Sequence, residues 1–248
     1  LVATSVSAGE LGVSGSWSWS YDSADSDESG NPMSMGDSVT FSGSGETDQG
    51  WTAGVSYELD GGTYDDYKLT LDMGDLGSLG YDDTDGHYGL AGLEDKMPMA
   101  YEQANDGLGT TGTAATMAKM ASGTGFGYST SVGGASISIG YSDNLGANTN
   151  RSDGVQDTTA TSVDSSSSVA ITYPVEDLGL TVFAGIGEEG QADGKELDHT
   201  TFGATYAFGP ATVGYQINDE DDSATGGTDY ETEIYGISFM VNLSLIHI

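Results

Sequence analysis

The 248-residue sequence contains no cysteine, and it has only 5 lysine and arginine residues against 39 aspartate and glutamate residues. Without cysteine, a disulfide-based scaffold and a thiolate metal site are both excluded. A nucleic-acid-binding protein neutralises phosphates with clustered basic side chains, and five scattered bases cannot form such a patch. No apolar run reaches the roughly 18 residues that a transmembrane helix requires. We therefore expect neither a nucleic-acid partner nor a helical membrane protein.

The aromatic residues, 14 Tyr, 6 Phe and 3 Trp, follow a period of two. Over residues 11–21 the apolar side chains, Trp17 and Trp19 among them, take odd positions, and Gly or Ser takes the even ones. Such alternation is typical of a β-strand with one apolar and one polar face. It recurs along the chain and predicts about twelve strands, with a short helix near 113–121. The expected strands are 10–21, 37–44, 51–59, 67–73, 76–81, 126–132, 137–141, 169–173, 180–186, 202–208, 213–217 and 235–241.

Short and long connections alternate between these strands. Tight turns carry Gly, Pro or Asp, as at Gly74-Asp75, Gly133-Gly134 and Gly209-Pro210, and these residues suit tight turns. The longest connection covers about 43 residues, 82–124. The pattern predicts an antiparallel up-and-down meander with its long loops at one end. The other loops at that end are expected over 22–36, 60–65, 143–165, 188–199 and 219–230, so that 82–124 is the third.

The composition of the two faces distinguishes a membrane sheet from a soluble one. The polar positions are mostly Ser, Thr and Gly, with few of the Lys, Arg and Glu residues of a solvated sheet surface. The apolar positions carry Tyr, Trp and Phe near strand ends. This arrangement favours an all-β transmembrane β-barrel with a wet lumen and aromatic girdles. The alternative is a secreted, acidic, all-β structural or adhesive cell-surface protein.

The ends of the chain differ from the rest. Residues 1–8, LVATSVSA, resemble the tail of a secretory signal peptide with a small-residue cleavage pattern. Residues 243–248, LSLIHI, resemble the translation of a transposase adapter used in sequencing libraries, although a short final strand is the alternative. We expect a signal-peptide remnant over 1–8, the β-barrel over 9–242 and a non-native tail over 243–248.

With these features the chain resembles a Gram-negative outer-membrane porin of the alphaproteobacterial general-diffusion type, truncated at both ends. The resemblance rests on the start GELGVSGSWSWSY, the strand and turn alternation, and the oversized third long loop. It implies a sixteen-stranded barrel, usually a homotrimer, in which the third loop folds inward and sets the constriction. About twelve strands are present, so either four are missing or the barrel is smaller. We favour truncation, because a 43-residue inward loop would nearly plug a narrow barrel.

Selectivity in a pore depends on the charges at its narrowest section. By analogy with the family, the acidic third loop supplies them, anchored to the wall by Leu90, Leu93, Met97, Met99 and Tyr101. The alternative is a solvated surface loop. Porins of this family often oppose the loop with a row of arginines, which this chain lacks, so a cation preference is expected. The candidate constriction residues are Asp82, Asp83, Asp85, Glu94, Asp95, Lys96, Glu102 and Asp106; the lumen-wall candidates are Glu58, Lys68 and Asp72.

No cofactor and no catalytic site are expected. His87 and His199 are predicted to lie in loops and His247 in the tail, and no nucleophile-elbow or HExxH pattern is present. Acidic loops suit Ca²⁺ or Mg²⁺, but none matches a spaced binding motif, so only loosely bound divalent ions are expected. The expected partners are outer-membrane lipid and lipopolysaccharide, two further copies of the chain, and small hydrophilic solutes and cations.

Overall fold

The structure, a computed structural model, describes residues 11–21, 33–82, 88–98, 125–142, 163–191, 196–222, 227 and 229–239. Within these residues it contains twelve β-strands and three 3₁₀ helices. The strands are β1 Gly12–Tyr21, β2 Met33–Glu46, β3 Thr52–Asp60, β4 Thr63–Asp72, β5 Ser78–Asp82, β6 Gly125–Val132, β7 Ala135–Ser142, β8 Val163–Val175, β9 Leu180–Gln191, β10 Glu196–Phe208, β11 Ala211–Asp222 and β12 Tyr230–Phe239. The helices are η1 Gly74–Leu76, η2 Gly89–Lys96 and η3 Glu176–Leu178.

The order of the strands in the sheet is their order in the chain, from β1 to β12. This confirms the predicted all-β, antiparallel, up-and-down meander and each of its twelve strands. The chain divides into two units, residues 1–74 with 78–82, and residues 75–77 with 83–248. The first unit holds β1–β5 and the second holds β6–β12. The predicted helix near 113–121 lies outside the described residues.

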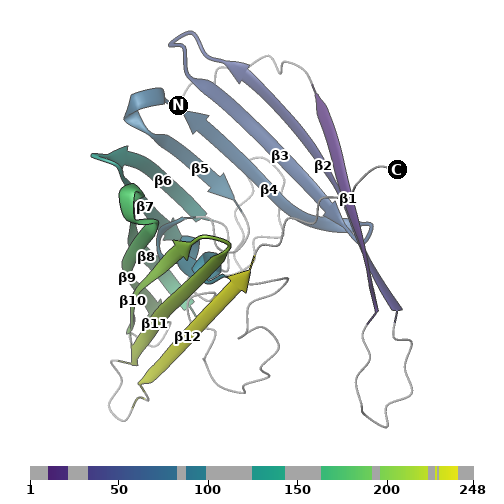
Figure 1. The fold of residues 1–248 in the computed structure, drawn as a ribbon. Helices are drawn as coiled ribbons and strands as arrows, with labels where there is room; N and C mark the ends of the chain where they lie inside the picture. The colour runs from purple at the N-terminus through teal and green to yellow at the C-terminus, as the bar shows by residue number, and fades with distance from the viewer. Residues whose placement is uncertain are drawn as a thin grey trace. The chain divides into compact units, whose positions relative to one another are not determined.

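In the first unit, β1–β5 form consecutive antiparallel pairs (Figure 1, purple to blue). The register places apolar side chains opposite apolar ones, as where Phe41 pairs with Tyr57 and Val55 with Leu69. These side chains share one face of the sheet because successive residues of a strand point to opposite faces. The other face carries Ser, Thr and Gly together with Glu58, which pairs with Thr40.

In the second unit, β6–β12 also pair consecutively (Figure 1, teal to yellow). The β6–β7 turn is made by Gly133 and Gly134, with φ angles of 58° and 85°. Two consecutive positive φ angles suit a two-residue hairpin turn, and glycine adopts them without steric cost. The tight Gly-Gly turn predicted from the sequence is therefore confirmed.

The apolar face of each unit is exposed. Trp17 is 74% exposed, and Ile186 and Tyr235 are 60% and 67% exposed. A continuous apolar surface of this kind is stable only against another apolar phase, such as a second protein layer or lipid. The small buried core of the described residues instead lies on the opposite face, around Leu90 and Phe183.

Several strands extend beyond their predicted boundaries. Residues 188–199 and 219–230 were expected to be loops, but β9 continues to Gln191, β10 begins at Glu196 and β11 continues to Asp222. His199 therefore lies in a strand and not in a loop. The prediction was wrong here because the apolar alternation stops before the backbone hydrogen bonds do, and the ladder does not depend on side-chain hydropathy. None of the helices among the described residues has the length and hydropathy needed to cross a membrane.

Candidate functional site

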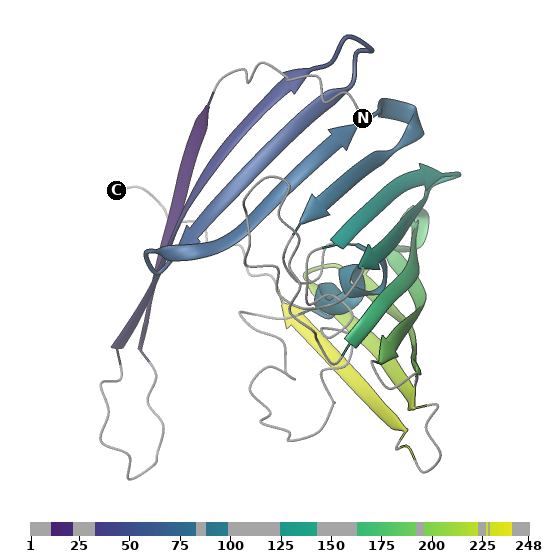
Figure 2. The same ribbon diagram turned by 180° about the vertical axis from the view of Figure 1, so that it is seen from behind.

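The segment Tyr88–Pro98, here called the inner segment, lies on the polar face of the second unit. In Figures 1 and 2 the blue coil of η2, which makes up most of this segment, lies against the teal and green strands. Two serine side chains of the sheet hold its start. The Gly89 amide donates to Ser138 Oγ at 2.8 Å, and the Leu90 amide donates to Ser168 Oγ at 3.0 Å. These bonds satisfy amides that lack a partner within the first turn of a helix.

Apolar side chains of the inner segment form the centre of the buried core. Leu90 is fully buried, and Leu93 and Met97 are nearly so. They cluster with Ala170 of β8, Phe183 of β9 and Ile234 of β12. This confirms the predicted anchoring of the loop by Leu90, Leu93 and Met97. The two further predicted anchors, Met99 and Tyr101, lie outside the described residues.

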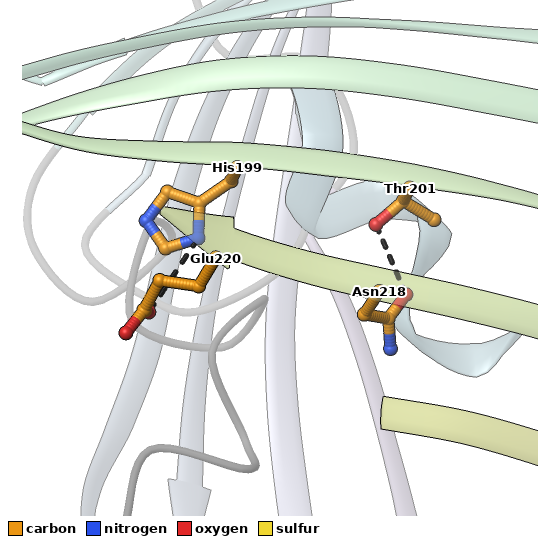
Figure 3. Close-up of polar contacts among 4 residues, drawn as sticks. All are labelled: His199, Thr201, Asn218 and Glu220. Carbon is orange, nitrogen blue, oxygen red and sulfur yellow. Dashed lines mark hydrogen bonds and ion pairs between the residues drawn. The ribbon is translucent and has the colours of Figure 1, made fainter. Parts of the chain in front are cut away.

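Buried amides and hydroxyls continue from the inner segment along the wall. Gln216 of β11 is fully buried, and its Nε2 donates to the Leu93 carbonyl at 3.4 Å and to Asn218 Oδ1 at 3.0 Å. Thr201 of β10 donates from Oγ1 to the same Asn218 oxygen at 3.0 Å (Figure 3). Through Gln216, this buried group of polar side chains contacts the inner segment, and hydrogen bonds are stronger in such a low-dielectric environment than in water.

A buried ionisable pair lies next to this network. His199 of β10 and Glu220 of β11 are register partners, and His199 Nδ1 lies 3.7 Å from Glu220 Oε2 (Figure 3). Both side chains are at most 2% exposed. Glu189, on the same face of β9, is also buried. Sequence reasoning missed this cluster, although Glu189, His199 and Glu220 occupy polar positions of the alternation.

The predicted constriction residues are only partly within the described structure. Glu94 and Asp95 belong to η2, where their backbone alone is described, and Lys96 follows them as a half-buried residue. Asp82 ends β5, directly opposite Lys68 in the register. The remaining four lie outside the described residues: Asp83, Asp85, Glu102 and Asp106.

The predicted lumen-wall residues all lie in the first unit. Glu58 of β3 and Lys68 of β4 are half-buried, and Asp72 at the end of β4 is exposed. By parity they lie on the face opposite the exposed apolar residues Val55 and Leu69. Among the described residues, no three His, Asp or Glu side chains are placed to hold a metal ion.

A family model for Gram-negative porins matches residues 1–244 of the chain. The chain belongs to the Gram-negative porin family. No curated protein matches it in a sequence comparison. Porins reside in the outer membrane, so the exposed apolar face is the lipid-facing surface and the polar face lines the channel. Family membership also removes the alternative of a secreted structural or adhesive protein.

Solved porins share the fold at low sequence identity. A porin refined at 1.8 Å resolution is 18% identical, with a TM-score of 0.53, covering 92% of this chain and 78% of that one. A porin of Comamonas acidovorans described as anion-selective is 18% identical, with a TM-score of 0.54 and coverages of 94% and 75%. OmpF of Salmonella typhi, solved with daunomycin, is 15% identical, with a TM-score of 0.54 and coverages of 85% and 65%. These similarities establish the porin fold of this channel protein.

Proposed function

We propose that this porin is a passive diffusion channel for small hydrophilic solutes, narrowed by its third loop and preferring cations. The observation that carries the proposal is the inner segment docked on the channel wall. Its core anchors and its bonds to Ser138 and Ser168 hold η2 against the polar face. Because η2 carries Glu94 and Asp95, two of the predicted constriction acids belong to a segment that lies against the polar face of the second unit.

The charge of the channel wall supports the cation preference. The partly or fully exposed polar-face positions of the described strands carry more acids than bases: Glu46, Glu58, Asp60 and Asp72 in the first unit, and Asp222 in the second. The bases within the described part of this face and segment are Lys68 and Lys96. Arg151 is the one arginine of these 248 residues, so they do not supply an opposing arginine row. The fold does not determine the sign of selectivity, since an anion-selective porin shares it; fixed charge does.

The preference can be measured as a reversal potential across a planar bilayer with a salt gradient. We expect the sign that corresponds to cation selectivity, because fixed carboxylates raise the local concentration of cations. Neutralising two acids of η2 together, Glu94→Gln with Asp95→Asn, should move the potential toward zero. The matched control is Glu188→Gln, an exposed acid on the lipid-facing side of β9, which should leave it unchanged. Anion selectivity of the unaltered porin would refute the assignment.

Removing the one basic residue of the predicted lumen wall should have a small effect. Lys68→Ala is expected to raise the cation preference only slightly, since a single charge is removed among many acids. The same reversal-potential measurement detects it, with the lipid-facing Leu69→Ala as the neighbouring control. A large change, or a change toward anions, would show that Lys68 dominates the field in the pore.

Assembly and processing follow the family resemblance. We propose a homotrimer in contact with lipopolysaccharide, with loosely bound Ca²⁺ or Mg²⁺ between acidic surfaces and anionic lipid.

Residues 1–8 are proposed to be a signal-peptide remnant, 9–242 the porin β-barrel and 243–248 a non-native tail; both end segments lie outside the described residues. Chemical cross-linking in detergent tests the trimer, and sequencing the source locus across residues 242–243 tests the tail. Native coding sequence for LSLIHI would refute the adapter origin.

A further inference from the structure

The strands of the channel wall carry glycine beneath both ends of the inner segment. Gly127 of β6 pairs directly with Gly140 of β7, and both lie beneath Tyr88. Gly214 of β11 pairs directly with Gly236 of β12, and both lie beneath Pro98. These two cross-strand glycine pairs therefore lie under the two ends of the inner segment.

The contacts leave no room for a side chain at Gly127 and little room at Gly140. A Cβ atom added to Gly127 would overlap the Tyr88 ring, and one added to Gly140 would lie 3.1 Å from the Tyr88 carbonyl oxygen. Normal carbon–carbon contacts are about 3.5–4.0 Å. The tyrosine ring thus occupies the space above β6 and β7 that a side chain would otherwise fill.

The second pair is equally crowded. A Cβ atom on Gly214 would lie 2.6 Å from Pro98 Cδ and 2.9 Å from Met97 Sδ. On Gly236 it would lie 2.7 Å from Pro98 Cδ and 2.8 Å from the Pro98 carbonyl oxygen. Pro98 has a rigid ring and cannot turn away as a flexible side chain could. The clash at this end would be resolved only by moving the backbone of the inner segment.

Glycine in the interior of a strand is unfavourable unless another group approaches closely. Here the approach is made by the inner segment at both pairs. We propose that the glycine pairs Gly127–Gly140 and Gly214–Gly236 position the inner segment across the channel and thereby determine the size limit of the solutes that pass. The second part rests on the proposed function, in which this segment narrows the pore.

Trypsin reports the position of the inner segment independently of conductance. The sequence offers five cleavage sites, of which Lys96 alone lies in the inner segment, and Met97 beside it is buried. Cleavage after Lys96 requires the segment to leave the wall, so its rate follows the population of the undocked state. Mass spectrometry distinguishes the Lys96 product from those at the other four sites: Lys68, Lys119, Arg151 and Lys195.

The test compares three alanine variants of the whole porin in detergent: Gly127→Ala, Gly214→Ala and Gly236→Ala. Cleavage after Lys96 should be about tenfold faster or more in each, because overpacking against a rigid neighbour favours the undocked state. Gly43→Ala in β2 is the matched control. There the nearest atom to a new Cβ is Val55 Cγ1 at 3.7 Å, an ordinary contact, so the rate should not change. An unchanged rate in the three folded variants would overturn the proposal.

Liposome swelling with sugars of increasing size measures the size limit of the same variants. We expect a changed limit in the three variants and none in Gly43→Ala. Faster cleavage with an unchanged size limit would mean that the glycines position the segment but that the segment does not narrow the pore. That result would refute both the constriction and the second part of this proposal. An unchanged cleavage rate refutes the positioning alone.

A variant that fails to fold still gives an answer. If Gly127→Ala does not reach the heat-modifiable folded form, adding Tyr88→Ala should restore folding, because it removes the ring that the new methyl group overlaps. Failure of Tyr88→Ala to restore folding would overturn the assignment of Gly127 to this contact.

Discussion

Replacing Leu90 with alanine is expected to release the inner segment from the channel wall while the surrounding strands stay folded. Leu90 is fully buried at the centre of the core cluster, beside Leu93 and Phe183. Truncating a buried leucine to alanine costs about 2–5 kcal/mol, through lost burial and the cavity left behind. This change lowers the stability of the docked state of the inner segment. The strands stay paired, because their backbone hydrogen bonds do not depend on this side chain.

Hydrogen exchange measures this release directly. The amides of Gly89 and Leu90 bond to serine hydroxyls of β7 and β8, so they are protected only while the segment is docked. A loss of 2 kcal/mol corresponds to about thirtyfold faster exchange through the undocked state. Leu178→Ala is the matched control, since Leu178 in η3 is 60% exposed. Equal exchange in the two variants would contradict the anchoring role of Leu90.

Removing one member of the buried pair His199 and Glu220 is expected to destabilise the porin strongly. Both side chains are at most 2% exposed and lie 3.7 Å apart. Taking away one partner of a buried pair typically costs about 3–5 kcal/mol, because the other stays in a low-dielectric site without its compensation. His199→Leu and Glu220→Leu should each lower the free energy of unfolding, measured by urea titration in lipid vesicles.

The double variant shows whether the loss of stability in the single variants comes from breaking the pair or from the change in side-chain volume. Replacing both partners by apolar residues is often close to neutral, so His199→Leu with Glu220→Leu should cost much less than the sum of the two single changes. The register neighbours Asp198 and Asp221 give the control. They pair on the opposite, lipid-facing side and both are exposed, so Asp198→Asn should change stability by no more than about 0.5 kcal/mol. Additive losses would show that the two side chains do not act as a pair.

The existence of each strand could be predicted from the sequence, but the positions of several strand ends could not. The alternation of apolar residues located every strand, since strand formation on a lipid-facing sheet needs only a local period of two. The predicted strands did not reach Glu189, His199 and Glu220, because acidic residues and histidine beyond the apolar band are typical of loops. The structure continues the backbone pairing through all three.

The location of the inner segment could be predicted only in outline. Resemblance to porins implied an inward loop, and its apolar residues indicated anchors. The wall contacts involve partners far apart in the chain: Leu90 and Ser168 are 78 residues apart, and Leu93 and Gln216 are 123 apart. No local pattern encodes such pairings. The glycines of β6, β7, β11 and β12 were visible only as small residues on a polar face.

The sequence by itself determined the number and order of the strands, the two faces of each, and the acidic character of the channel. These properties follow from alternation and composition, which act on neighbouring residues. The tertiary structure alone decided which polar residues are buried, which glycines face the inner segment and which histidine meets a carboxylate. Those outcomes depend on the register between strands and on the docking of a distant segment, and a slip of one residue in register would exchange every side chain between lipid and channel.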